Sequence, residues 1–336
     1  MTITRYNSPG VTPRTNVYAE RELLRHAEPV MVLDKLALNK TMPKNKTETI
    51  SFRRPRTFSA ATTPLQEGVT PSATDFGYDD VSTKLLQYGQ KVHITDVVED
   101  LHEDQVGRDM ALNLAQNIGR TMEALNWGVV RSGTNVFRSN GATRGDINTP
   151  ISLSRQRAVV RALRQQKAQM ISKVIKPGLE YATRAVQPAY VAVAHTDLES
   201  DIRNLPTFLP TAQYSGKDRV SEYEIGSVEN VRYITSPDLE PFLGEGSLTL
   251  NGMVSSAGAG GDRVDVYPIV YFGQDAWATV ALRGQGAVTP SIIPANQRTK
   301  DDPLGQRGVI AWKTYHTALI LNQLWMARLE VGATLL

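Results

Sequence analysis

Apolar and polar residues follow two different spacings along this chain, one typical of strands and one of a long helix. Residues 49–53 alternate between apolar and polar side chains, and residues 81–95 do so again with a change of face near Leu85. Both segments are therefore predicted to be β-strands, the second with a bulge. Between about 105 and 131, apolar residues recur every three or four positions, which predicts a helix roughly 40 Å long at 1.5 Å per residue.

The segment between the two predicted strands, residues 53–80, contains three prolines and few residues that could fill a core. Unstructured connections longer than about 12 to 15 residues are uncommon inside one domain. The segment is therefore predicted to be the tip of a long hairpin, with basic residues on one limb and acidic residues on the other. A two-stranded ribbon is marginal alone and needs another surface. We expect inter-subunit polar contacts from Arg53, Arg54, Arg56, Glu67, Asp79 and Asp80.

The rest of the chain alternates shorter helices and strands. A turn-rich segment, 132–150, separates the long helix from a second region that is predicted to be an α/β lobe. A Gly/Ser-rich segment, 244–262, is predicted to be a flexible loop. The other predicted elements are helices at 17–27, 152–170 and 197–205, and strands at 190–194, 230–235, 264–272 and 288–294, followed by two strands on either side of Asn322.

Composition narrows the class of protein. Hydrophobic residues make up 41% and charged residues 21% of the 336 residues, as in ordinary folded proteins. The absence of cysteine excludes disulfides, thiolate metal sites and cysteine nucleophiles. No run approaches the roughly 18 apolar residues of a membrane span, so we expect a soluble chain without membrane contact. The net charge of +3 does not by itself indicate a nucleic-acid-binding protein.

Candidate chemistry is sparse. The motifs GxxxxGK[ST], GxGxxG after a strand, HExxH and GxSxG do not occur, and no cofactor or metal is expected. The cluster His102-Glu103-Asp104 is more typical of a solvated helix start than of a metal site. His195 and Asp197 follow a strand and open a helix, where catalytic residues often lie. We favour Thr196 as a helix cap and His195 as a turn residue.

One segment is strongly basic. Between residues 155 and 176, seven basic residues occur without an acidic one. Such a helix could contact nucleic acid electrostatically, but it lacks interleaved aromatic residues, so a solvated or inter-subunit face is favoured. The candidate interior basic face consists of Arg155, Arg157, Arg161, Arg164 and Lys167.

The order of these elements resembles the major capsid proteins of tailed bacteriophages with the HK-ninety-seven-like fold. Particular segments resemble the N-four-type major capsid family, and they occur in the expected order over nearly the whole chain. They are TPRTNVYAERELL (12–24), MPKNKTETISFRR (42–54), TTPLQEGVTP (62–71), LLQYGQKVHITD (85–96), GTNVF (133–137), VAHTDLESDIRN (193–204), GSVENVRYITSP (226–237) and DPLGQRGVIAWK (302–313).

The resemblance implies an α+β fold in five parts. These are an N-arm with the first helix (1–48), an E-loop hairpin (49–84), a peripheral domain with the spine helix (85–149), an axial domain (150–240), and a Gly-rich loop with return strands that complete the peripheral domain (241–336).

By the same resemblance, the chain would be a non-enzymatic coat protein of the virion. It would assemble in the bacterial cytoplasm as hexamers and pentamers into an icosahedral shell around double-stranded DNA. Only about 14 residues precede the first predicted helix, so we expect a separate scaffolding protein, together with a portal and, in some shells, a decoration protein. No residue is assigned to cross-linking.

Three alternatives remain at this point. An encapsulin-like nanocompartment shell would share the fold and enclose protein cargo. An α/β enzyme using His195 and Asp197 would require a lined cleft. A DNA-binding protein using residues 155–176 would bind as a monomer or dimer with a steep salt dependence.

Overall fold

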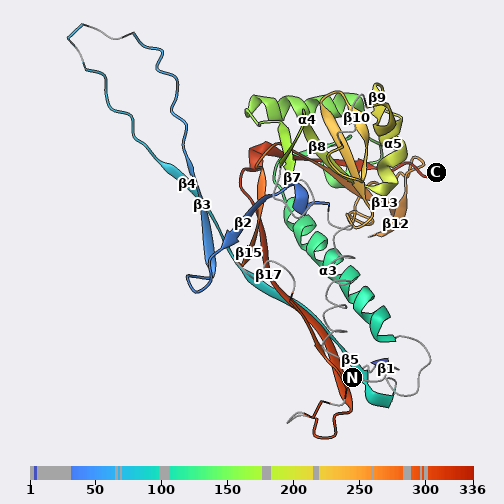
Figure 1. Cartoon of the computed structure of the whole chain (residues 1–336). Helices are drawn as coiled ribbons and strands as arrows, with labels where there is room; N and C mark the ends of the chain where they lie inside the picture. Colours follow the sequence, from blue (N-terminus) through green and yellow to red (C-terminus); the bar gives the residue numbers. More distant parts are fainter. Residues whose placement is uncertain are drawn as a thin grey trace.

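In its described residues, the computed structural model of the chain has two large β-sheets, one long helix beside both of them, and a protruding hairpin (Figure 1). It therefore has the mixed helix and strand content that the sequence predicts. The structure describes residues 4–5, 32–64, 67–68, 70–97, 106–175, 183–214, 219–258, 260–282, 289–295, 297–298 and 302–336.

The first sheet has six strands. The long strand β17 pairs with β5 and β15 and also with β16, and all three of these pairings are antiparallel. In spatial order the strands are β1 (Thr4–Arg5), β5 (Leu86–Thr95), β17 (Arg307–Ile320), β15 (Trp277–Leu282) and β2 (Leu38–Met42), with β16 (Thr289–Ile293) beside β17.

The second sheet has eight strands and mixed pairing, because β8 is parallel to β11 and antiparallel to β14. In spatial order the strands are β6 (Val136–Arg138), β18 (Met326–Gly332), β14 (Val266–Phe272), β8 (Thr183–His195), β11 (Val231–Ser236), β10 (Glu224–Val228) and β9 (Phe208–Pro210), with β7 (Ile171–Ile175) beside β8.

Helices and two small hairpins complete the described chain. The helices are α3 (Val106–Val130), α4 (Leu153–Gln165) and α5 (Glu199–Arg203), with short 3-10 turns η2 (Asp34–Leu36), η3 (Arg144–Asp146), η4 (Thr196–Leu198), η5 (Thr211–Gln213) and η6 (Gln323–Trp325). The hairpins are β3 (Thr49–Pro55) with β4 (Tyr78–Lys84), and β12 (Ser255–Gly258) with β13 (Gly261–Val264).

Helix α3 contributes to two hydrophobic cores. Leu114 and Ile118, in its first half, pack with Ile310 and Trp312 of β17. Trp127 and other residues at its end belong to the core under the eight-stranded sheet. Since 25 residues span about 37 Å, the helix is long enough to support both sheets, and the predicted helix at 105–131 is present.

The eight-stranded sheet is covered on both faces. In β8, Tyr190 and Ala192 belong to the core that includes Val159 and Leu163 of α4, whereas Val191 belongs to the core at the end of α3. A strand buried on both faces consists of a nearly continuous apolar run, which explains the sequence YVAVA at 190–194.

The β3–β4 hairpin extends away from the rest of the molecule (Figure 1). At its base, Ile50, Phe52 and Val81 pack on a small cluster that includes Met42 and Val280. Between β3 and β4, the described residues 56–64 and 70–77 form no helix or strand. The predicted bulge corresponds to the interruption at Leu85, where the chain passes from this hairpin into the six-stranded sheet.

One sequence-based expectation requires revision. The flexible loop predicted at 244–262 contains β12 and the start of β13, which pair from Ser255↔Val264 to Gly258↔Gly261. The segment 241–336 contributes strands to both sheets, because β14 and β18 lie in the eight-stranded one. Every residue of β14 is buried, so this strand needs cover on both faces. The helix predicted at 17–27 lies outside the described residues.

Candidate assembly surfaces

The charged residues predicted to contact another subunit pair with one another along the hairpin. The register places Arg53 opposite Asp80 and Arg54 opposite Asp79. The Arg53 guanidinium donates two hydrogen bonds to the Asp80 carboxylate, Nε to Oδ1 at 2.8 Å and Nη2 to Oδ2 at 2.9 Å. Asp79 accepts from Arg56 Nε at 2.7 Å and from Arg54 Nη2 at 3.5 Å.

These pairs lie at the surface and act mainly on the hairpin itself. The Arg56 guanidinium holds the pKa of Asp79 below its ordinary value, and Arg53 does the same for Asp80. Exposed ion pairs contribute little to stability individually, since solvent screens them. Because the ion pairs cross from β3 to β4, they nevertheless favour one pairing register of these strands. They lie next to Pro55 and Tyr78, the last paired residues of the hairpin.

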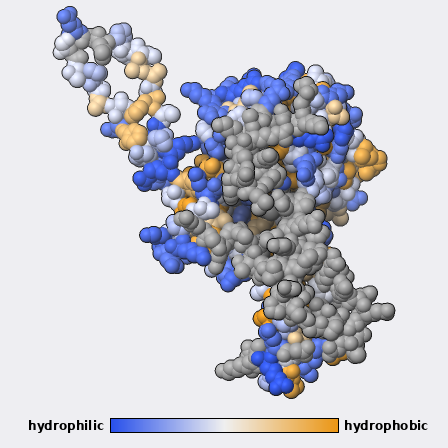
Figure 2. Space-filling model, viewed as in Figure 1, coloured by the Kyte–Doolittle hydropathy of each residue, from blue (hydrophilic) through white to orange (hydrophobic). Residues whose placement is uncertain are grey.

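Aromatic side chains lie beside this ion-pair ladder. Phe58 and Phe76 have ring centroids 5.9 Å apart, and Phe76 meets Tyr78 edge-on at 4.7 Å. The Arg53 guanidinium lies over the Tyr78 ring, 5.1 Å from its centroid. The three rings are 58%, 54% and 49% exposed, respectively. We call Phe58, Phe76 and Tyr78 the aromatic cluster; hydrophobic patches are visible on the protruding limbs in Figure 2.

The aromatic cluster was not among the contact residues predicted from the sequence. The available signal was three aromatic residues within a segment that is otherwise poor in apolar side chains. Isolated exposed apolar residues are normal on protein surfaces, whereas a contiguous group indicates an interaction surface. Glu67, the remaining predicted contact residue, is an exposed residue in the segment between the limbs.

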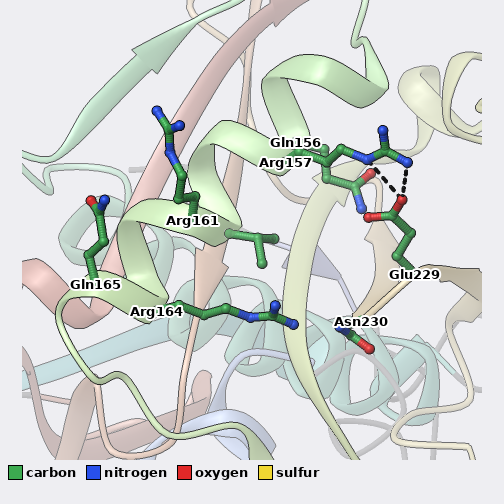
Figure 3. Close-up of a pocket in the computed structure, with 8 residues that line it drawn as sticks. Gln156, Arg157, Arg161, Arg164, Gln165, Glu229 and Asn230 are labelled. Atoms are coloured by element: carbon green, nitrogen blue, oxygen red, sulfur yellow. Dashed lines mark hydrogen bonds and ion pairs between the residues drawn. The ribbon is translucent and has the colours of Figure 1, made fainter.

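A second surface lies on α4. A pocket of about 440 Å³ opens between this helix and the turn that joins β10 to β11 (Figure 3). Its lining includes the arginines at 157, 161 and 164, and Glu229 and Asn230 come from the turn. Arg157 Nε donates to Glu229 Oε1 at 2.9 Å. Glu229 adopts a positive φ of 54° in this turn.

Three of the five residues of the predicted basic face lie at this pocket. Arg157, Arg161 and Arg164 line the pocket, whereas Arg155 donates through Nε to the Ser139 carbonyl oxygen at 3.0 Å. Lys167 follows the helix and has a positive φ of 55°. Glu229 was missed as a partner because it lies 72 residues from Arg157 in the sequence.

His195 and Asp197 form a local turn. His195 Nδ1 accepts a hydrogen bond from the Asp197 backbone N–H at 3.1 Å, so His195, and not Thr196, caps this turn. Tyr267 donates its hydroxyl hydrogen to Asp197 Oδ2 at 2.7 Å. The α4 pocket includes neither His195 nor Asp197.

Within the described residues, no group of three or more His, Asp or Glu side chains is arranged to hold a metal ion. No helix in this part of the chain is both long and apolar enough to cross a membrane. The cluster at 102–104 lies outside the described residues.

The architecture is that of capsid-shell subunits. The capsid of cyanophage Pam1 matches with a TM-score of 0.60 and 12% identity, covering 92% of both chains. The capsid of Ralstonia phage GP4 matches with a TM-score of 0.60 and 11% identity, covering 91% of this chain and 90% of that one. The capsid of cyanophage P-SCSP1u gives 0.57 and 11%, covering 90% and 88%. At these identities the similarity establishes a shared fold.

The family follows from the sequence itself. The profile of the family described as phage capsid protein matches residues 78–329, about three quarters of the chain. No curated protein matches. The chain belongs to the phage capsid protein family. It is a major capsid protein of a bacteriophage, a structural protein and not an enzyme, and the interpretation of His195 and Asp197 as catalytic residues is set aside.

Proposed function

We propose that this chain forms the icosahedral shell of a tailed phage as an N-four-type major capsid protein with the HK-ninety-seven-like fold. In this proposal the subunits assemble as hexamers and pentamers around double-stranded DNA. The carrying observation is the β3–β4 hairpin, which leaves the body of the subunit and exposes the aromatic cluster. A surface of this kind needs a partner, and closed assemblies supply identical neighbours.

The aromatic cluster is the proposed anchor of the hairpin on an adjacent subunit. Aromatic residues dominate the energetics of many interfaces because they bury large areas with few rotatable bonds. The ion-pair ladder of Arg53, Arg54, Asp79 and Asp80 keeps the limbs paired before contact. Preorganisation of this kind reduces the entropy lost on association.

The proposed division of the chain follows the arrangement of its cores. Residues 1–48 form the N-arm, 49–84 the E-loop, and 85–149 the helix-containing part of the peripheral domain. Residues 150–240 contribute β7 to β11 with α4 and α5 to the axial domain. The segment 241–336 then completes both domains, because its strands enter both sheets.

The proposed partners are further copies of the chain, a separate scaffolding protein, a portal, a decoration protein in some shells, and packaged DNA. Assembly takes place in the bacterial cytoplasm and the product is the virion capsid. A basic surface around α4 would suit non-specific contact with DNA as a secondary role.

Negative-stain electron microscopy combined with light scattering tests the proposal. The chain is expressed alone and together with the scaffolding protein encoded near its gene. We expect ring-shaped capsomers or closed particles, because many modest contacts add up in a closed shell. A monodisperse monomer under both conditions would contradict the proposal.

Variants of the hairpin make the test specific. The double variant Phe76→Ala/Tyr78→Ala is expected to lose closed particles while the purified subunit stays folded. The matched control is Leu248→Ala, which truncates a side chain that is 55% exposed outside the hairpin. Charge reversal at Arg54 and Arg56 tests the ladder, and wild-type assembly of that variant would remove these arginines from the proposal.

A further inference from the structure

The charge distribution of α4 is unfavourable for an isolated helix. Its 13 residues include four arginines and no acidic residue, and its first turn has no acid to match the positive end of the helix dipole. Arg157, Arg161 and Arg164 are spaced by four and three positions, so they are neighbours on one face. Like charges at these spacings destabilise a helix. An anion on this face would relieve that repulsion.

The surroundings of the pocket orient part of this charge. Glu229 accepts two hydrogen bonds from Arg157, through Nε at 2.9 Å and Nη2 at 2.5 Å, which fixes that guanidinium. Arg164 lies near the Tyr190 hydroxyl, which donates to the Ala168 carbonyl oxygen at 2.9 Å. Within the described parts of the chain, Arg161 has no hydrogen bond or ion pair. Three arginines against one glutamate leave two positive charges at the pocket.

The floor of the pocket is rigid. Gln156 is fully buried, donates through Nε2 to the Val228 carbonyl oxygen at 3.0 Å and accepts at Oε1 from the Tyr233 hydroxyl at 2.9 Å. The Gln156 side chain therefore joins α4 to β10 and β11. The turn between these two strands carries Glu229 and Asn230. Figure 3 shows the Arg164 side chain extended toward Asn230 on the same side as the Arg157–Glu229 pair.

We propose that this pocket binds phosphate groups, with Arg161 and Arg164 as the donors that are not held by a carboxylate. The guanidinium fork matches the oxygens of phosphate, which makes arginine well suited to phosphate recognition. Arg157 and Arg164 lie seven residues apart, about 10 Å along the helix axis. Along the axis of duplex DNA each strand has one phosphate about every 3.4 Å, so this length, laid along that axis, would span about three phosphates. The volume of about 440 Å³ also suits a small polyphosphate.

Binding measurements on the purified full-length chain test this inference. The probes are tripolyphosphate, followed by calorimetry, and a short fluorescent DNA duplex, followed by anisotropy over a range of salt concentrations. The variants are Arg161→Gln and Arg161→Gln/Arg164→Gln. The matched control is Arg155→Gln, which removes the same charge from the same helix at a residue bonded to the Ser139 carbonyl.

We expect each pocket arginine removed to weaken binding by about tenfold or more, since hydrogen bonds to charged groups are among the strongest. The control should retain nearly wild-type affinity. Tripolyphosphate binding that competes with the duplex identifies a general phosphate site. Duplex binding with the same dependence on Arg161 but without competition identifies the nucleic-acid backbone as the source.

Two results would overturn the inference. One is equal loss of affinity in Arg155→Gln and Arg161→Gln, which would show diffuse attraction by the whole helix. The other is a wild-type chain that binds neither probe. Arg161 is exposed and its single variant removes no hydrogen bond or ion pair within the described chain, so a folding defect should not obscure the result. Phosphate binding is measured on the purified chain, whereas assembly is measured separately by electron microscopy. Failure of the phosphate-binding test would therefore leave the assembly proposal standing, and failure of assembly would leave the phosphate-binding inference standing.

Discussion

Glu123 is an ionisable residue in the interior, and its replacement by glutamine gives a sharp test of the folded structure. The side chain lies on α3 with 0% exposure. Its Oε1 and Oε2 accept from the Leu33 backbone N–H at 3.1 and 3.3 Å. Burial raises the pKa of Glu123 from 4.5 to about 8, with smaller contributions in the same direction from Asp34 and Asp238, whereas the backbone N–H groups of Val32 and Leu33 act in the opposite direction.

The sign of the effect follows from proton linkage. Between pH 4.5 and 8 the folded chain keeps the proton on Glu123 and the unfolded chain releases it, so the free energy of unfolding falls as pH rises. The difference between the two pKa values corresponds to about 5 kcal/mol over the whole range. His316 contributes the opposite slope at lower pH, because burial lowers its pKa and its stabilising contribution is lost on acidification. Between pH 6.5 and 8 the contribution of Glu123 is about 2 kcal/mol.

The substitution Glu123→Gln resembles the protonated carboxyl group and removes the titration. The variant should match the wild type near pH 5 and become progressively more stable than the wild type toward pH 8. Denaturant unfolding followed by tryptophan fluorescence measures this, because buried Trp127 lies one turn further along α3 and bonds the Glu240 carbonyl. Glu199→Gln, at a partly exposed helix pair, is the control. Parallel pH profiles for wild type and Glu123→Gln would refute the reasoning.

Three further substitutions test the packing. Gly89→Ala would place a Cβ 2.6 Å from the Trp312 carbonyl oxygen, so it should lower the free energy of unfolding by about 1–3 kcal/mol. In Gly128→Ala on α3 the added Cβ meets nothing within 4 Å, so this variant should raise the free energy of unfolding by about 0.5–1 kcal/mol. Denaturant midpoints that change in the same direction for Gly89→Ala and Gly128→Ala would contradict the structure. Tyr271→Phe removes the 3.0 Å hydrogen bond between the hydroxyl groups of Tyr271 and Tyr233 and should cost about 1 kcal/mol, which a thermal unfolding midpoint equal to that of the wild type would contradict.

Elements with a regular hydrophobic pattern could be predicted from the sequence. The helix α3 followed from its three- and four-residue spacing, and β8 followed from the continuous apolar run at 190–194. The strands β17 and β18 were found on either side of Asn322. These elements bury large apolar surfaces, and the positions that must be buried are therefore apolar in the sequence.

Side-chain partners could not be predicted in the same way. Arg157 meets Glu229 only because the turn between β10 and β11 lies beside α4, which depends on the tertiary fold. The cap supplied by His195 depends on the backbone conformation of the turn, which the residue types alone do not reveal. Ser255 pairs with Val264 at the end of a Gly/Ser-rich segment. The composition of this segment indicates flexibility, and the strand register cannot be determined from the sequence.

The charged residues of the hairpin pair with one another within the chain, and their contact with another subunit stays a prediction. The antiparallel register puts Arg53 against Asp80 and Arg54 against Asp79. A limb whose charges are already paired brings little net charge to an interface, and separating those pairs would cost part of the contact energy. The aromatic cluster has no comparable internal burial, since each ring remains about half exposed. In the proposed contact with a neighbouring subunit, hydrophobic burial of the rings would be the larger source of free energy, and the ion pairs would hold the limbs together in the conformation that presents the rings.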